Sequence, residues 1–149
     1  MKLIKIISVL VLLFEASLLN AQRSLVYAHD NSGFKRAKEL FTAKKYVAAQ
    51  RKFKQVCNNI EEPHSEVKMN SEYYVALCAL ELFNQDAEYL FLKFIEKNPQ
   101  SPKVRIARVQ LGKYYYRKKK WTNAVKWFQQ VDENDLETNM LPEYHFKYG

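Results

Sequence analysis

The stretch LGKYYYRKKKWTNAVKWFQQV, residues 111–131, places tyrosine, tryptophan and phenylalanine next to runs of lysine and arginine. This mixture has two interpretations. Aromatic rings and positive charges together form surfaces that bind single-stranded nucleic acid. The same residues can instead form two packed helices, with the rings buried and the lysines in the turn between them. The rest of the chain favours the second interpretation, because the stretch is repeated.

The segment KKYVAAQRKFKQV, residues 44–56, matches KKWTNAVKWFQQV, residues 119–131, and a weaker copy, NQDAEYLFLKF, occupies residues 84–94. Shared small and aromatic residues recur at separations of 38 and 37: Ala49, Ala87 and Ala124, and Phe53, Phe91 and Phe128. A second set of small residues lies upstream, each followed three positions later by a matching residue: Ala37 and Leu40, Ala76 and Ala79, Gly112 and Tyr115. A period of this length is typical of stacked helical units.

Each unit has the pattern of two helices. Ser101 and Pro102 provide a capping residue and a first helical position. Thr122 predicts the cap of the following helix, with Trp121 folded back against it as a hydrophobic staple. In the second unit Asp86 predicts the corresponding cap, and one residue is missing between the two helices.

The third unit resembles a tetratricopeptide repeat. It has Leu111 and Gly112, a tyrosine three residues later, an aromatic residue before the second helix, and then Ala124 and Phe128 four residues apart. The resemblance implies an all-α fold, a right-handed superhelix of stacked antiparallel helix pairs. The implied units cover about residues 32–62, 65–99 and 101–136, with the start of a fourth at 141–149. Six aromatic residues are expected in the core: Tyr46, Phe53, Phe91, Tyr115, Trp121 and Phe128.

In this family the first helices of the pairs line a concave surface that holds a peptide or a helix of a partner protein. Counting from the small residues, ten positions are expected to be exposed in this groove: Phe34, Lys38, Phe41, Tyr73, Leu77, Leu80, Val109, Lys113, Tyr116 and Arg117. An acidic and apolar partner segment would suit them. The alternative is that some of these residues only pack against the N-terminal tail or a further domain.

The N-terminal residues predict export. Lys2 and Lys5 precede a short apolar run that ends at a small residue, which indicates a signal peptide over residues 1–21 and a tail over residues 22–31. A buried N-terminal helix is the alternative. No membrane span is expected after removal of the signal. Together with the resemblance, export implies the periplasm or outer membrane of a Gram-negative bacterium, in envelope assembly, secretion or motility machinery.

The charge permits a second function. With 24 lysine and arginine residues against 16 acidic ones, the net charge is +8, and basic segments occur at residues 35–45, 51–54 and 114–120. The protein could therefore bind nucleic acid or an anionic envelope polymer. Export makes a nucleic-acid partner the less expected of these.

Motifs of catalysis are missing from the sequence. His29, His64 and His145 have no metal-binding spacing, and there is no glycine-rich phosphate loop or G-x-S-x-G motif. We expect a non-enzymatic protein without metal or cofactor. Cys57 and Cys78 lie on helices expected to pack together, so they form either a disulfide or two free buried thiols.

The end of the sequence repeats an earlier motif. Tyr148 and Gly149 follow Leu111 and Gly112 by 37 residues. The segment at residues 141–149 is therefore expected to begin a helix of a fourth unit whose partner helix is absent. Such a helix would leave an apolar face that favours self-association or fraying.

Overall fold

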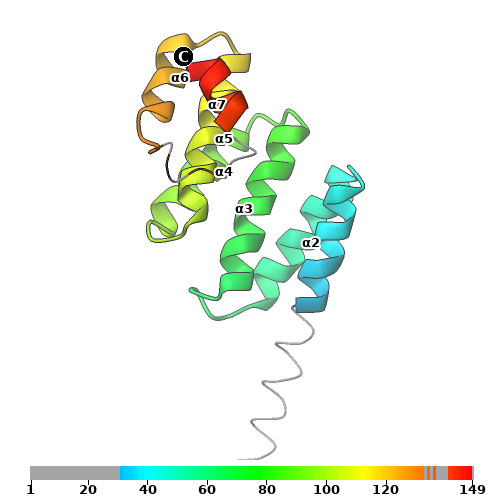
Figure 1. The fold of residues 1–149 in the computed structure, drawn as a ribbon. Coiled ribbons are helices and arrows are strands. Elements are labelled where there is room, and N and C mark those ends of the chain that lie inside the picture. The colour runs from blue at the N-terminus through cyan, green and yellow to red at the C-terminus, as the bar shows by residue number, and fades with distance from the viewer. Residues whose placement is uncertain (1–30, 133, 135, 137–140, 149) are drawn as a thin grey trace, which may run out of the picture.

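The computed structural model describes residues 31–132, 134, 136 and 141–148. In these residues the regular structure is helical, which confirms the all-α prediction (Figure 1). The helices cover residues 31–42 and then α2 Tyr46–Asn59, α3 Glu66–Glu81, α4 Ala87–Lys97, α5 Lys103–Arg117, α6 Trp121–Phe128 and α7 Leu141–Tyr148. The predicted signal peptide and nearly all of the predicted tail lie outside the described residues. No helix in the described part of the chain is both long and apolar enough to cross a bilayer.

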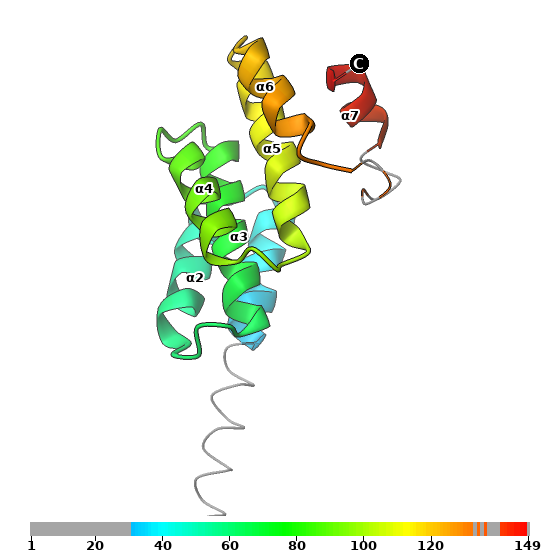
Figure 2. The ribbon, with the colours of Figure 1, turned by 90° about the vertical axis from the view of Figure 1, so that its left-hand side faces the viewer.

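Consecutive helices form antiparallel pairs: residues 31–42 with α2, α3 with α4, and α5 with α6 (Figure 1). Seen from the side, α2 and α4 lie along one side of the molecule, and residues 31–42, α3 and α5 lie toward the other side together with α7 (Figure 2). We call these sides the second-helix face and the first-helix face. Because α3 packs against both α2 and α4, and α5 against both α4 and α6, the pairs are stacked as in a helical repeat.

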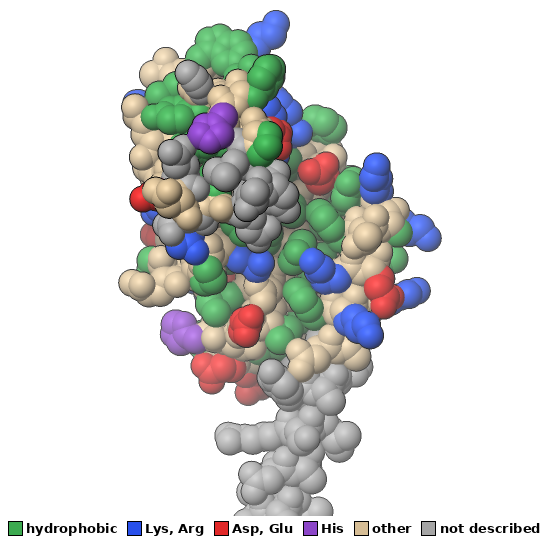
Figure 3. Space-filling view, in the orientation of Figure 1, with side chains coloured by type: hydrophobic (Ala, Val, Ile, Leu, Met, Phe, Trp, Pro, Cys, Tyr) green, Lys and Arg blue, Asp and Glu red, His purple; other side chains and the backbone are tan. Residues whose placement is uncertain are grey.

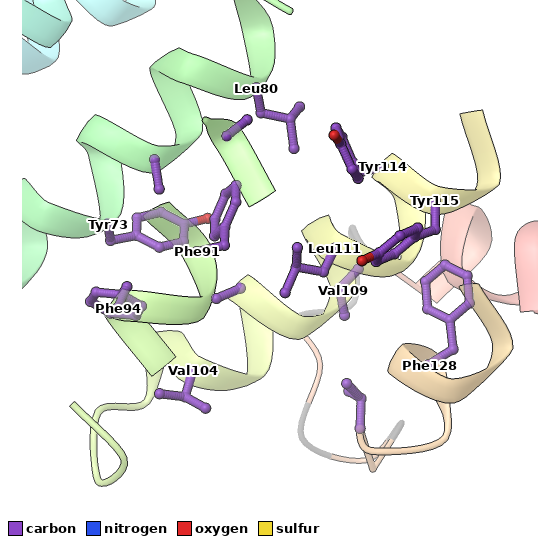
Figure 4. Close-up of a cluster of buried hydrophobic side chains, with 14 of the residues drawn as sticks. Tyr73, Leu80, Phe91, Phe94, Val104, Val109, Leu111, Tyr114, Tyr115 and Phe128 are labelled. Atoms are coloured by element: carbon purple, nitrogen blue, oxygen red, sulfur yellow. The ribbon is translucent and has the colours of Figure 1, made fainter. Parts of the chain in front are cut away.

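The repeated residues form the core. Ala49, Ala87 and Ala124 are buried, and the side chains of Phe53, Phe91 and Phe128 have no exposed surface. Figure 4 shows Phe91 and Phe128 in one cluster with the buried Tyr115 between α5 and α6. Burial of these large apolar side chains is the main stabilising contribution that the repeat supplies.

The turn inside each pair is built the same way three times. Lys44 adopts a left-handed backbone with φ of 58°, and its N–H donates to the carbonyl of Phe41 at 2.9 Å. The next N–H, of Lys45, donates to the carbonyl of Leu40 at 2.9 Å. This is a Schellman motif, which satisfies the last carbonyls of the first helix. The left-handed residue and the carbonyl that closes each turn recur in register: Lys44 and Leu40, Phe83 and Ala79, Lys119 and Tyr115.

The second turn differs after this motif. Ala87 follows Phe83 by four residues, whereas Ala49 follows Lys44, and Ala124 follows Lys119, by five. The N–H of Ala87 consequently bonds to Asn84 in a tighter, three-residue turn at 3.3 Å before α4 becomes regular. The prediction of one missing residue between these helices is confirmed.

The predicted start of α6 is wrong, and the predicted cap of α4 is right in position only. Trp121 is the first residue of α6 and Thr122 lies inside the helix, because the Schellman turn leads directly into α6. Trp121 is 52% exposed, so it is neither a staple nor a core residue. Asp86 occupies the cap position of α4 but makes no capping hydrogen bond with its side chain. Pro102, and not Ser101 as predicted, occupies the cap position of α5, although the hydroxyl of Ser101 accepts the N–H of Lys103 at 3.3 Å.

The last helix, α7, packs against α5 and α6. Its buried Tyr144 donates its hydroxyl to the carbonyls of Phe128 at 3.2 Å and of Val131 at 3.5 Å. The Tyr144 ring also meets the Phe128 ring edge-on, with centroids 5.5 Å apart. The predicted helix at residues 141–149 is thus present over 141–148, while Phe146 on the same helix is 79% exposed.

Candidate partner-binding surface

Three of the ten predicted groove residues are not available to a partner. Tyr73, Leu80 and Val109 are 4%, 3% and 2% exposed. The prediction assumed that each first helix buries one stripe, but α3 and α5 pack against helices on several sides. Tyr73 consequently points into the core toward Phe91 and Phe94, as Figure 4 shows. These three residues stabilise the fold and do not line a groove.

The other seven predicted residues reach the surface. Arg117 is exposed, and six more are half-buried: Phe34, Lys38, Phe41, Leu77, Lys113 and Tyr116. Figure 3 views the first-helix face, where hydrophobic side chains alternate with lysine and arginine. This face therefore combines apolar area with positive charge.

Tyr74 holds the N-terminal part of this face together, and the sequence did not single it out. Its ring lies 6.0 Å from that of Phe34 and 5.3 Å from that of Phe41, both in edge-on contacts. Lys38 donates to the Tyr74 hydroxyl, and its Nζ lies 4.3 Å from the ring centroid. Tyr74 is one position beyond Tyr73, which rotates it by about 100° around α3 and brings it to the surface.

Lys113 has a structural partner. Its Nζ lies 2.5 Å from Oε2 of Glu143 on α7, and Lys147 donates to the other oxygen of the same carboxylate. Partial burial alone would raise the pKa of Glu143, but the hydrogen bonds from the two lysines outweigh it and lower that pKa. Lys113 therefore joins α5 to α7, and its charge is not fully available to a partner.

An exposed group of aromatic and cationic side chains lies where α5 ends. We call Phe83, Tyr116, Arg117 and Trp121 the turn-end cluster. The Tyr116 and Trp121 rings meet edge-on at 5.0 Å, and the guanidinium carbon of Arg117 lies 5.7 Å from the Phe83 ring centroid. Phe83 is 81% exposed and Trp121 is 52% exposed. The cluster thus presents rings from two successive helix pairs to solvent.

Positive charge surrounds the turn-end cluster. Lys118, Lys119 and Lys120 follow Arg117 directly, and all are exposed. From the other side, Lys147 of α7 places its Nζ 5.7 Å from the Tyr116 ring centroid. The neighbouring residues Tyr114 and Tyr115 point inward and are buried. The stretch at residues 111–131 is thus buried on one side and exposed on the other.

The hydroxyl of Tyr115 donates to the carboxylate of Glu88 on α4. Burial and this hydrogen bond raise the pKa of Tyr115 to about 12. Tyr115 therefore stays protonated at neutral pH, and its hydrogen bond joins the third pair to the second. The repeat pattern had predicted only a packing role for this residue.

The two cysteines are free thiols. Cys57 Sγ lies 3.9 Å from the carbonyl of Lys68 in the first turn of α3. Cys78 is ten residues further along the same helix, which corresponds to about 15 Å at 1.5 Å per residue. A disulfide requires Cα atoms within about 7 Å. The antiparallel packing of α2 on α3 therefore rules out the bridge, and burial raises the pKa of each thiol to about 12.

No group of three or more histidine, cysteine, aspartate and glutamate side chains in the described residues is arranged to hold a metal ion. Comparisons with models of known protein families, with curated proteins and with solved structures found no match to this chain. The likeness to tetratricopeptide repeats rests on the motif in the sequence, and the stacked helix pairs agree with a helical repeat.

Proposed function

We propose that the protein is a non-enzymatic scaffold of tetratricopeptide type that binds a segment of a partner protein. Binding takes place on the first-helix face and is anchored at the turn-end cluster. The observation that carries the proposal is the exposure of Phe83 and Trp121 beside Arg117. A right-handed superhelix, which the family resemblance implies, would make this face concave.

The cluster has the composition of a binding hot spot. Tryptophan, tyrosine and arginine account for a large share of the binding energy at protein interfaces. Apolar surface that is buried on binding contributes roughly 25 cal/mol per Å². The Tyr116 ring already packs on Trp121, so a ligand would meet a pre-arranged pair at a low entropic cost.

The surrounding charges select the kind of segment. Arg117 and the exposed Lys118–Lys120 present four successive cations. The acidic residue of α7, Glu143, already accepts hydrogen bonds from Lys113 and Lys147. A partner that carries acidic residues next to an apolar anchor would complement both the charges and the rings.

The expected setting is the envelope of a Gram-negative cell, because residues 1–21 have the pattern of a signal peptide. Mass spectrometry of the protein recovered from an envelope fraction tests this part. A mature N-terminus near Gln22 supports export, and an intact Met1 contradicts it.

The binding role is tested with two exposed aromatic residues, one inside the turn-end cluster and one outside it. Phe83→Ala removes a ring of the turn-end cluster, whereas Tyr89→Ala removes a 62% exposed ring from α4. Partners are captured from envelope extract by crosslinking, and the affinity of the captured protein is then measured for each variant. We expect Phe83→Ala to weaken binding tenfold or more, about 1.4 kcal/mol, with a wild-type melting temperature. Equal losses for the two variants would contradict the proposal.

Binding of nucleic acid or an anionic envelope polymer is the alternative function, favoured by the exposed lysines 118–120. Salt distinguishes the two. Binding to phosphates weakens steeply as salt releases counterions, while a contact anchored by Phe83 changes little. The alternative is favoured if the protein binds a polyanion at 50 mM salt and releases it by 200 mM salt. This binding should also be unchanged in Phe83→Ala.

A further inference from the structure

A pocket is lined by side chains of α2, α3 and α4, where α3 packs against the other two helices. Its volume is about 160 Å³. Val75, Leu90 and Phe94 form an apolar part of its wall, and Cys57 contributes its half-buried thiol. A protein cavity of about 150 Å³ with apolar walls can hold one benzene molecule. The pocket is thus large enough for a single ring or a short hydrocarbon chain.

The pocket is lined by more positively than negatively charged side chains. Its one acid, Glu72, is already occupied: Lys97 donates to one carboxylate oxygen, and Asn98 Nδ2 donates to the other at 3.2 Å. Lys54 from α2 and Lys93 from α4 line the pocket and are exposed at its rim. Neither of these two lysines forms an ion pair with any residue in the described part of the chain. The rim therefore carries two uncompensated positive charges above an apolar wall.

We propose that this pocket binds a small apolar carboxylate. The ring or short chain of the ligand lies against Val75, Leu90 and Phe94, and its carboxylate lies between the ammonium groups of Lys54 and Lys93. A carboxylate exposed at the rim keeps part of its hydration, and the nearby cations favour it over a neutral group of the same shape. A cationic ligand would be repelled. This site is separate from the turn-end cluster and does not depend on the proposed scaffold function.

Cys57 supplies a reporter inside the pocket. Its side chain is half-buried, whereas Cys78 has no exposed surface and serves as an internal control. A ligand seated in the pocket covers Cys57 and slows its alkylation, without affecting the already buried Cys78. Labelling at pH 8.5 with iodoacetamide, read by mass spectrometry of the two cysteine peptides, measures this protection.

The probes are benzoate and its neutral isostere benzamide, applied to the full mature chain. We expect benzoate to slow labelling of Cys57 in a saturable way and to bind at least fivefold more tightly than benzamide. Lys54→Gln combined with Lys93→Gln should abolish the difference between the two probes. Lys44→Gln combined with Lys126→Gln changes the net charge equally at exposed positions outside the pocket and should keep the difference.

Equal protection by benzoate and benzamide would overturn the proposal, because the lysines would then play no part. Loss of the preference in both double variants would also overturn it, since a general charge effect would explain that result. If Cys57 is too slow to label in the folded protein, the thermal shift produced by the two probes on the wild type and the two double variants gives the same comparison. No shift with either probe would then overturn the proposal.

Discussion

The first and third helix pairs share one sequence pattern but pack differently. In both, the small residue of the first helix precedes the left-handed turn residue by seven positions and the core phenylalanine by sixteen. In the first pair the small residue is Ala37, which is buried with Phe53. In the third pair it is Gly112, and a Cβ placed there would lie only 2.4 Å from Cε1 of Phe128. The shared pattern therefore fixes which residues face each other, and the small residue sets how closely the ring approaches the helix.

The helix that follows each pair in sequence, among the described helices, covers its phenylalanine with a tyrosine. The Phe53 ring stacks on Tyr74 of α3, with centroids 5.0 Å apart and planes 13° from parallel. The Phe128 ring meets Tyr144 of α7 edge-on instead. The two tyrosines occupy different positions in their helices, so the same covering role is filled from two registers. Unit-to-unit contacts can thus change while the interior of the pair stays the same.

The largest expected effect tests what the two pairs share. Phe128→Ala and Phe53→Ala each remove a ring without exposed surface. Lost burial together with the remaining cavity should lower the free energy of unfolding by roughly 3–5 kcal/mol in both cases. Urea unfolding followed by circular dichroism measures it. A loss below about 1 kcal/mol for either variant would show that the ring is not part of a tightly packed core.

Residues that follow the repeat were accessible from the sequence. The core phenylalanines, the small residues and the missing residue in the second turn all came from the period, because burial and turn geometry repeat with it. The start of α6 was missed, since Thr122 is a common capping residue and the Schellman turn leaves no place for one. Local preference was overridden there by a hydrogen-bonded turn.

The candidate site was less accessible than the fold. Counting from small residues placed Tyr73 on the surface and passed over Tyr74, because α3 has neighbours on several sides and the period marks only one of them. The repeat pattern also did not predict that Tyr144 of α7 covers Phe128. No sequence motif predicted the exposed ring of Phe83. Its place in a left-handed turn was known only from the structure.

The second prediction separates the two pairs. In an ordinary helix, replacing glycine by alanine gains about 1 kcal/mol. Gly112→Ala should instead destabilise the protein by about 1–3 kcal/mol, because the added methyl group meets the Phe128 ring and overpacks the core. The reverse change in the first pair, Ala37→Gly, should cost only about 1 kcal/mol.

A double variant checks that the ring is the cause. Combined with Phe128→Leu, the substitution Gly112→Ala should cost less than it does alone, a coupling that equilibrium unfolding of the four proteins detects. Independent, additive effects would mean that the close approach of Gly112 and Phe128 does not control stability.

The third prediction tests the cover over the third pair. Tyr144→Phe keeps the edge-on ring contact and removes the hydroxyl that bonds to the Phe128 and Val131 carbonyls. We expect a loss of about 0.5–1.5 kcal/mol, the usual net value of one hydrogen bond. Amide exchange should quicken in α6 and α7 and stay unchanged in α2. Faster exchange throughout the chain would contradict a local role for Tyr144.

The smallest expected effect returns to what the pairs have in common. Lys119 and Lys44 both adopt left-handed backbones, with φ of 57° and 58°. This conformation costs a residue with a Cβ roughly 1–2 kcal/mol, and glycine avoids that cost but gives back about 0.5–1 kcal/mol through the greater freedom of the unfolded chain.

Lys119→Gly and Lys44→Gly should therefore each stabilise the protein by up to about 1 kcal/mol. Their gains should be equal within error, unlike the responses at Gly112 and Ala37, because the turn is the same in both pairs. Thermal and urea unfolding of the two variants measure the gains. Lys126→Gly, at an exposed position inside α6, is the control and should lose about 1 kcal/mol. A loss in Lys119→Gly beside a gain in Lys44→Gly would mean that the two turns are not equivalent, and that the lysine side chain at the third turn makes a stabilising contribution of its own.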